Sequence, residues 1–419
     1  MKDLKAEIFL KVEEYFNSKE IVSNDKIGVA YPCFDHKEVN QALDSLLDLW
    51  ISQGPKVKLF EKSFSEYIGT KYGVACNSGS SANLLALSAL IKCGKLKPGS
   101  EVIVPAATFT TVISPILQNG LVPVFVDVEM DTYNICPKSI EEAITPKTGL
   151  IMIVHTLGCS AKIDKIMELS KTFDIPVLED CCEAHGSTMN NKKAGSFGLI
   201  STWSFFVAHN MTTGEGGMIL TDDEELDEML RSIREFGRLT KYEKDKPRFY
   251  YTDEELKDYD ERYVFTNIGY NLRMTDLAAS LGIEQLKKLD GFNNKRVKIA
   301  KQYNNLFSKF SKYLILPEIP ENTFHSFYGY PIVVNSDKFT RKELVNHLEK
   351  DNIETRAFMG GNLSKQPAYR TENCLISGNL ENTDNLFNNA FFIGCHPFIT
   401  KNNIETIINS FETFFATHG

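Results

Sequence analysis

The stretch GLIMIVHTLGCSAKIDKIMELSKTFDIPVLED, residues 149–180, decides the fold class. It begins and ends with short apolar runs, 149–155 and 175–180, which are typical of buried strands. The segment between them, 161–173, has the apolar spacing of an amphipathic helix. A strand, a helix and a second strand in this order predict two parallel strands joined by a crossover helix. We therefore expect an α/β fold whose mainly parallel sheet is covered on both faces.

The same alternation extends to both sides of this stretch. A helix is expected over SANLLALSALIKCG (81–94), and more strands are expected in YGVAC (72–76), EVIVPA (101–106), VPVFVDV (122–128), TWSFF (202–206) and GGMILT (216–221). Ligands of parallel α/β sheets bind at the carboxyl ends of the strands. Side chains that follow these runs are therefore the candidates for a functional site.

The length of 419 residues predicts two or three structural units. We expect an N-terminal surface helix over 1–24 and a large ligand-binding domain over 25–290. A smaller C-terminal α/β domain is expected over 291–419. Within the large domain, the polar and tyrosine-rich stretch 237–265 predicts an excursion on the surface, which suits a function or a partner subunit.

Composition excludes several classes of protein. Hydrophobic residues make up 42% and charged residues 24%, which is typical of a soluble globular protein. A formal charge of −9 argues against a nucleic-acid surface, because phosphate binding needs clustered Lys and Arg. The N-terminus lacks the pattern of a secretory signal, and no apolar run reaches the roughly 18 residues of a membrane span. We expect a cytoplasmic protein that binds neither nucleic acid nor membrane.

The nine cysteines show no metal-binding spacing, so no metal site is predicted. An odd number without paired spacing favours free thiols in a reducing compartment. Cys181 and Cys182 are expected to pack in or beside a buried strand.

A first candidate motif is NSGSSANLLALSAL, residues 77–90, which places a turn of small residues between a strand and a helix. Gly79 allows the backbone to approach a ligand closely, and the amides of Ser80 and Ser81 would lie at the positive end of the helix. Phosphate is the natural occupant of such a place. An ordinary turn in which serine caps the helix explains the motif equally well.

A second motif is IPVLEDCCEAHGS, residues 175–187, where a strand ends in two acidic residues. Asp180 would lie where small molecules bind. A buried carboxylate needs a cationic partner, since isolating its charge costs several kcal/mol. A protonated pyridine ring would serve, and so would a salt bridge to a Lys or Arg of the chain.

Two further segments carry candidate side chains. STWSFFVAHNMTTGEGGM (201–218) supplies the hydroxyl of Ser204 and then His209, followed by glycines that permit unusual backbone geometry. PAATFTTVISP (105–115) supplies Phe109, which could stack on a flat cofactor or belong to the core.

Together these motifs and IGYNLRMTDLAAS (268–280) resemble the DegT/DnrJ/EryC1/StrS sugar aminotransferase family, in order and spacing, from about residue 25 to the C-terminus. The resemblance implies the aspartate aminotransferase fold, also called fold type I of pyridoxal phosphate enzymes. It implies that Gly79, Ser80 and Ser204 hold the phosphate of that cofactor. A homodimer with shared active sites also follows from it.

The resemblance assigns further cofactor contacts. Phe109 would stack on the pyridine ring, and Asp180 would keep the ring nitrogen protonated, so that the ring accepts electrons. Glu183 stands where the family usually has glutamine beside the phenolic oxygen of the cofactor. Asn271 matches an asparagine that reaches the phosphate bound by the neighbouring subunit.

His209 departs from the family, which has at this position a lysine that bonds covalently to the cofactor. Histidine cannot form that bond, but it can move protons near neutral pH. This departure is similar to that of the nucleotide-sugar 3-dehydratases, which make 3,6-dideoxy sugars. We therefore expect a dehydratase that uses pyridoxamine phosphate to remove the C3 hydroxyl of an NDP-4-keto-6-deoxy sugar, with His209 as its catalytic base.

Two alternatives stay open from the sequence. One is an aminotransferase whose lysine has been replaced by histidine in the laboratory. The other is a catalytically silent paralogue that acts as a regulatory partner. The presence of Gly79, Asp180, Ser204 and Asn271 disfavours the silent paralogue.

The subgroup has a branch with an iron-sulfur cluster, whose cysteines lie before the GYNL motif. Residues 237–265 contain no cysteine, so the chain resembles the cluster-free branch. L-glutamate would then regenerate pyridoxamine phosphate. The segment IETRAFMGGNLSKQP (353–367) offers Arg356 and Asn362 as substrate contacts, and either residue could instead be structural.

Overall fold

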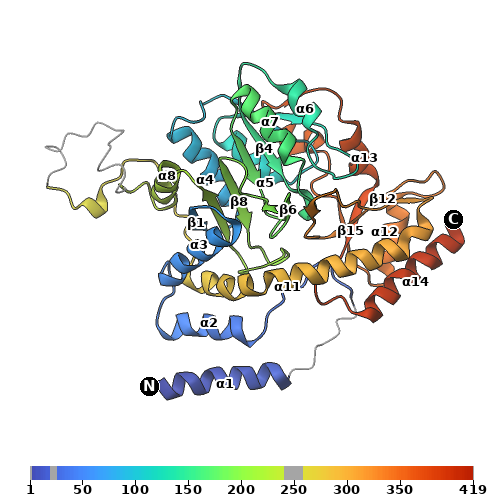
Figure 1. The fold of residues 1–419 in the computed structure, drawn as a ribbon, viewed down its shortest axis with the longest axis horizontal. Coiled ribbons are helices and arrows are strands. Elements are labelled where there is room, and N and C mark those ends of the chain that lie inside the picture. Colours follow the sequence, from blue (N-terminus) through green and yellow to red (C-terminus); the bar gives the residue numbers. More distant parts are fainter. Residues whose placement is uncertain (1, 19–25, 240–257, 419) are drawn as a thin grey trace.

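The computed structural model of the chain describes residues 2–18, 26–239 and 258–418. Its largest sheet has eight strands in the spatial order β1-β9-β8-β5-β4-β2-β3-β14 (Figure 1). The strands are β1 Tyr72–Cys76, β2 Glu101–Pro105, β3 Val122–Val126, β4 Thr148–Val154, β5 Val177–Asp180, β8 Ile200–Ser204, β9 Gly217–Thr221 and β14 Leu375–Ile376. β9 runs antiparallel to both of its neighbours, and the other adjacent pairs are parallel. The expected strands and the α/β class are confirmed.

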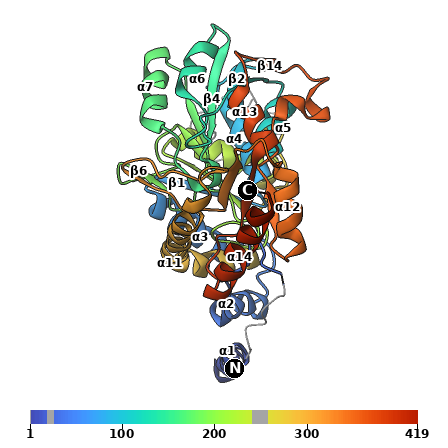
Figure 2. The same ribbon diagram turned by 90° about the vertical axis from the view of Figure 1, so that its right-hand side faces the viewer.

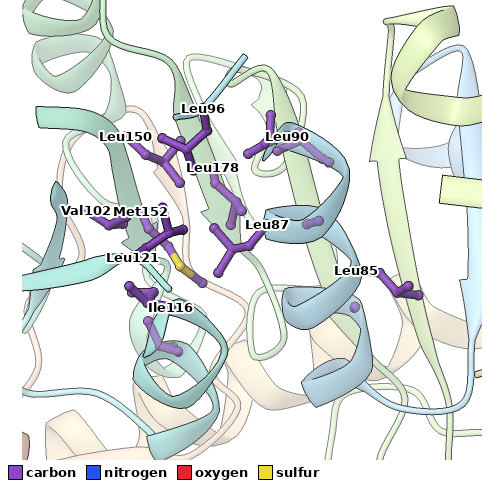
Figure 3. Packing of buried hydrophobic residues seen from close by; sticks show 14 of the residues in the cluster. Leu85, Leu87, Leu90, Leu96, Val102, Ile116, Leu121, Leu150, Met152 and Leu178 are labelled. Carbon is purple, nitrogen blue, oxygen red and sulfur yellow. The ribbon is translucent and has the colours of Figure 1, made fainter. Parts of the chain in front are cut away.

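Helices cover both faces of this sheet, which explains why its strands are almost continuously apolar. In β2, Val102 and Val104 face one side and Ile103 faces the other. Figure 3 shows the first side, where Leu87 of the helix after β1 points toward Met152 and Leu178 of neighbouring strands. The helices on this side are α4 Gly79–Lys92, α5 Thr110–Gln118 and α8 Glu224–Arg234. The opposite side is covered by α6 Pro137–Ala143, α7 Ile163–Phe173, α3 Pro55–Ile68 and α11 Asp276–Phe307.

A second, antiparallel sheet has the order β10-β12-β15-β13. Its strands are β10 Leu314–Ile315, β12 Tyr330–Val334, β15 Ala390–Ile393 and β13 Thr355–Ala357. Three elements pack around it in an apolar cluster of their own, namely α12 Arg341–Lys350, α14 Lys401–His418 and the end of α11. The smaller elements are α13 Glu381–Asn389 and a three-stranded sheet of β11 Thr323–Phe324, β6 Thr188–Met189 and β7 Lys192–Lys193.

The long helix α11 connects the two apolar clusters (Figure 1). Its first half places Ala279 and Leu289 against the main sheet, and its second half places Tyr303 and Phe307 against the second sheet. The expected domain boundary at residue 290 falls inside this helix, which runs without interruption. The boundary between the two domains therefore stays a prediction.

The N-terminal helix α1 Lys2–Ser18 lies at one end of the molecule, against α2 His36–Leu47 (Figure 2). A capping box at Asp35 and Glu38 fixes the start of α2. Most of the expected surface excursion, residues 240–257, lies outside the described residues. None of the helices in the described ranges combines the length and the apolarity that a membrane crossing needs.

Candidate active site

The carboxyl ends of β1, β5 and β8 lie at one edge of the main sheet, because these strands run in the same direction. Gly79 follows β1 and lies against Ser204, the last residue of β8. A Cβ atom on residue 79 would stand 2.5 Å from Cβ of Ser204, which is too close for two carbon atoms. Glycine is therefore required at position 79 for the two strand ends to meet.

The N-terminus of α4 begins at this meeting point. Ser78 caps the helix, since its Oγ accepts a hydrogen bond of 3.1 Å from the N–H of Ser81. The first-turn N–H groups of Gly79 and Ser80 have no acceptor within the helix. Ser204 Oγ accepts from the N–H of Phe206 at 3.3 Å, which leaves the hydroxyl proton for a ligand. The arrangement suits an anion at the positive end of α4.

Asp180 ends β5 and is held in one orientation by two hydrogen bonds. Its Oδ2 accepts from Nδ2 of Asn83 at 2.8 Å, and its Oδ1 accepts from the N–H of Cys182 at 3.0 Å. Its side chain is almost completely buried. The nearest ion pair on this strand joins His155 to Glu179 and leaves Asp180 without a cation among the described residues. Asp180 is thus an oriented carboxylate that can receive a cationic ligand group.

Glu183 lies one turn beyond Asp180 and is half-buried. Its Oε2 accepts a hydrogen bond of 2.8 Å from the N–H of Leu157. Burial and the neighbouring Asp180 carboxylate raise the pKa of Glu183 to about 8, although the Leu157 N–H opposes this shift. A carboxyl group with this pKa is mostly protonated near pH 7.

His209 lies in the turn after β8, where its N–H donates to the carbonyl of Phe206 at 3.0 Å. Its Nδ1 is buried and has no hydrogen-bond partner among the described residues. Burial lowers the pKa of His209 to about 3, and the positive charge of Arg296 adds to this effect. The imidazole is therefore neutral near pH 7 and is available as a base.

Three aromatic rings lie beside His209, and the ring centroid of Phe206 is 6.3 Å away. The ring centroid of Tyr328 lies 5.2 Å away, and that of the buried His185 lies 5.9 Å away. The backbone of Tyr328 is fixed on both sides: its N–H donates to the carbonyl of Leu157 at 2.9 Å, and its carbonyl accepts from Nη1 of Arg296 at 2.9 Å. These bonds hold the segment before β12 against the turn that carries His209.

Phe109 and Asn271 lie on the surface of the described chain. Phe109 is the N-cap residue of α5, just beyond the end of β2, and its side chain is 53% exposed. Asn271 is exposed, and its Oδ1 accepts from Nε of Arg273 at 3.1 Å. Both assigned roles need a ligand or a second subunit, so they stay predictions.

The two expected substrate contacts differ in their surroundings. Arg356 on β13 is exposed and pairs with Glu354 at 2.6 Å. Asn362 is buried: its Nδ2 donates to Asp384 at 2.8 Å, and its Oδ1 accepts from the hydroxyl of Ser364 at 2.6 Å. Asn362 thus has a structural task, and a substrate contact by either residue stays a prediction.

Sequence reasoning missed three residues that shape this site, namely Asn83, Leu157 and Tyr328. Asn83 is completely buried, and its Oδ1 accepts from the hydroxyl of Thr202 at 2.7 Å. The sequence did offer a signal for Asn83, which is a single amide inside the apolar helical run 81–94. A polar side chain that is buried there requires a hydrogen-bond partner. No local signal identifies Leu157 or Tyr328, whose roles depend on contacts between distant segments.

The residues at this strand edge fit a pyridoxal derivative. Gly79 leaves a cradle at a helix N-terminus that suits the phosphate, and Ser204 adds a hydroxyl. Asp180 suits a protonated ring nitrogen, because it is buried, oriented and without a cation. His209, whose Nδ1 has no hydrogen-bond partner among the described residues, lies in the turn after the next strand, β8. The site can therefore bind a phosphorylated pyridine and move a proton beside it.

Comparisons with known proteins agree with this geometry. The model of the DegT/DnrJ/EryC1/StrS aminotransferase family matches residues 32–412. The dTDP-4-dehydro-2,6-dideoxy-D-glucose 3-dehydratase of Saccharopolyspora spinosa is 37% identical, over 99% of this chain and 93% of that protein.

Two solved structures are also similar. That of Escherichia coli GDP-4-keto-6-deoxy-D-mannose-3-dehydratase with bound hydrated PLP has a TM-score of 0.84 and 34% identity, over 92% of this chain and 98% of that one. That of a GDP-4-keto-6-deoxymannose-3-dehydratase with a trapped PLP-glutamate geminal diamine has a TM-score of 0.83 and 34% identity, over 91% of this chain and 99% of that one.

Proposed function

The chain belongs to the DegT/DnrJ/EryC1/StrS aminotransferase family, and from this premise we propose that it is a 3-dehydratase of a nucleotide-linked 4-keto-6-deoxy sugar. The observation that carries the proposal is His209, a neutral imidazole without a hydrogen-bond partner at Nδ1. It lies in the turn after β8, the strand that pairs with β5, and β5 ends in Asp180. The proposal is supported by one similar protein and two similar solved structures, all of which are named as 3-dehydratases. An aminotransferase with an introduced histidine and a silent paralogue are both less consistent with these relatives.

Pyridoxamine phosphate, when bound, supplies an amino group that combines with the C4 carbonyl of the sugar and a ring that accepts electrons. Gly79, Ser80 and Ser204 would hold its phosphate at the N-terminus of α4. Asp180 would keep its ring nitrogen protonated, because both carboxylate oxygens are already oriented by Asn83 and Cys182.

His209 performs the proton transfers of the reaction. With a pKa of about 3 the ring is neutral, so it can accept a proton from the carbon that carries the cofactor's amino group. The resulting imidazolium is a strong acid in this buried place. It can therefore pass the proton to the departing C3 oxygen, which leaves as water. One side chain serves both transfers.

L-glutamate is the proposed amino donor that restores pyridoxamine phosphate. The solved 3-dehydratase structure with a trapped PLP-glutamate geminal diamine supports this role. The sugar product leaves as an enamine and hydrolyses to a 3,6-dideoxy-4-keto sugar and ammonia. No iron-sulfur cluster takes part in this proposal.

The test is an incubation of the protein with an NDP-4-keto-6-deoxyhexose, pyridoxamine phosphate and L-glutamate. We expect loss of the C3 oxygen, measured by mass spectrometry, together with release of ammonia. A 4-amino sugar as the only product would contradict the proposal and favour an aminotransferase. The assay should be run on several nucleotide sugars, since no residue described above specifies the nucleotide.

The proposed enzyme acts as a homodimer. Four apolar side chains near Asn271 are exposed on the described chain, namely Phe236, Phe265, Ile268 and Tyr270. A surface of this kind is typical of a protein interface, and Asn271 would reach the partner's phosphate site from it. Analytical ultracentrifugation should give twice the mass of the chain, and a monomer would contradict the proposal. The cytoplasm is the proposed location, because all nine cysteines are free thiols.

A further inference from the structure

Asn210, the residue after His209, attaches the turn after β8 to two other segments. Its side chain is almost completely buried. Its Nδ2 donates to Oδ1 of Asn293 on α11 at 2.8 Å and to the carbonyl of Ser326, before β12, at 3.0 Å. Both acceptors are oxygen atoms, so the nitrogen of this amide must face them. Since that nitrogen carries two protons, both of its donors are in use.

The two acceptors are themselves fixed in the interior. Asn293 is buried in the middle of α11, and its Nδ2 donates to the carbonyl of His185 at 2.7 Å. Ser326 is also buried, and its N–H donates to the carbonyl of Gly158 at 3.0 Å. Asn210 therefore joins the turn to α11, to the segment before β12 and, through Asn293, to the segment after β5.

The imidazole of His209 depends on these attachments, because its Nδ1 has no hydrogen-bond partner among the described residues. The backbone of the turn and the neighbouring rings set its position. The rings of Tyr328 and His185 lie 5.2 and 5.9 Å from that of His209, measured between centroids. Tyr328 belongs to the segment that accepts from Asn210, and the carbonyl of His185 is bonded to Asn293. One amide thus holds the turn together with both of these rings.

We propose that Asn210 is a positioning residue for His209: it fixes the turn that carries the imidazole, so that the ring is aimed at the proton it removes. The fixing of the turn is a property of the protein alone, whereas its effect on the rate rests on the proposed function. No hydrogen bond of the described residues joins Asn210 to Gly79 or Asp180, so cofactor binding should not depend on it. A displacement of a reacting group by about 1 Å can lower a rate on the order of a hundredfold.

The test replaces asparagine with leucine, which has nearly the same shape and no hydrogen-bonding atom, so no charge is introduced beside His209. Asn119 provides the matched control. Its Nδ2 donates to the carbonyl of Pro115 at 2.8 Å, and its Oδ1 accepts from the hydroxyl of Ser88 at 2.7 Å. It lies just before β3, at the amino ends of the parallel strands and thus at the edge of the sheet opposite to the site.

The first experiment measures amide hydrogen exchange of the cofactor-free protein by mass spectrometry, over residues 205–214. The N–H of His209 donates to the carbonyl of Phe206 at 3.0 Å and reports on opening of the turn. We expect Asn210→Leu to raise the exchange rate of this segment about tenfold, because two hydrogen bonds are lost. Asn119→Leu should leave it at the wild-type rate. Unchanged exchange in Asn210→Leu would overturn the inference.

The second experiment measures deoxygenation of the nucleotide sugar per molecule of bound pyridoxamine phosphate. We expect Asn210→Leu to lower kcat about a hundredfold and to change KM at most about twofold, whereas Asn119→Leu should keep the wild-type kcat. In a protein that already carries His209→Asn, adding Asn210→Leu should lower the remaining rate at most about twofold. A hundredfold loss in both backgrounds would show a structural role that does not act through His209, and it would overturn the positioning role.

If Asn210→Leu does not fold, Asn293→Leu decides, because it removes one of the two acceptors from the other side. It should raise the exchange of residues 205–214 and lower kcat about tenfold. Wild-type values of both would overturn the inference. A wild type that deoxygenates no nucleotide sugar would instead overturn the proposed function, and the exchange measurement would still decide whether Asn210 fixes the turn.

Discussion

Two neighbourhoods, each with a histidine and a glutamate, lie near the end of the same strand, β5, and they differ in how fully their polar atoms are used. In the first, Glu179 is completely buried and accepts hydrogen bonds from Nε2 of His155 and from the N–H groups of Gly195, Phe197 and Gly198. Nδ1 of His155 accepts from the N–H of Ala161 at 3.0 Å. Every polar atom of this pair has a partner.

In the second neighbourhood, Glu183 has one hydrogen bond and His209 leaves Nδ1 without a partner. The electrostatics differ accordingly. Burial alone would raise the pKa of Glu179, but the hydrogen bonds from His155 and the backbone outweigh burial and lower it. Burial dominates at Glu183 and His209, and it favours the neutral form of both. The saturated pair stabilises the fold, whereas the unsaturated pair is left for a ligand.

The largest expected effect comes from removing the imidazole of the unsaturated pair. His209→Asn should lower the rate of C3 deoxygenation about a thousandfold, because general acid-base catalysis contributes on the order of 10²- to 10⁴-fold. The melting temperature should change little, since Nδ1 of His209 has no partner to lose. Ammonia release and thermal denaturation measure the two quantities. A variant that keeps a tenth of the wild-type rate would show that another group moves the proton.

The next effect comes from breaking the saturated pair. Glu179→Gln replaces a carboxylate that accepts from three backbone N–H groups, so it should lower the free energy of unfolding by about 3 to 5 kcal/mol. Glu183→Gln should change it much less near pH 7, because a neutral acid is exchanged for a neutral amide. Urea denaturation of both variants makes the comparison. Equal losses of stability would remove the distinction between the two neighbourhoods.

The smallest expected effect concerns the residue that orients Asp180. Asn83→Ala removes the hydrogen bond to Oδ2 and should weaken pyridoxamine phosphate binding about tenfold, since a hydrogen bond to a charged group contributes about 1.5 to 3 kcal/mol. Asn388→Ala, at an exposed position of α13, is the control and should bind as the wild type does. Unchanged affinity in Asn83→Ala would show that Cys182 alone suffices to hold the carboxylate.

Much of this architecture could be predicted from local patterns. The apolar runs 149–155 and 175–180 and the helix between them predicted parallel strands, and parallel strands place Asp180 and Ser204 at one edge. The turn of small residues at Gly79 predicted the helix N-terminus that lies there. These features depend on residues that are close together in the chain, so they can be predicted from the sequence.

The sequence could not predict which of the two histidine–glutamate neighbourhoods has hydrogen-bond partners for all of its polar atoms. Glu179 and Glu183 lie four positions apart, and nothing local shows that only Glu179 meets three backbone N–H groups. The conformation of Leu157, with φ of 51°, is equally hidden, because leucine rarely adopts a positive φ. Tyr328 reaches His209 only through the packing of segments that are distant in the chain.

The left-handed residue Leu157 has a mechanical consequence for the candidate active site. Its N–H donates to Glu183 and its carbonyl accepts from the N–H of Tyr328, so two residues of the site are held in position by one residue. A displacement of Leu157 would therefore move the Glu183 side chain and the Tyr328 backbone together.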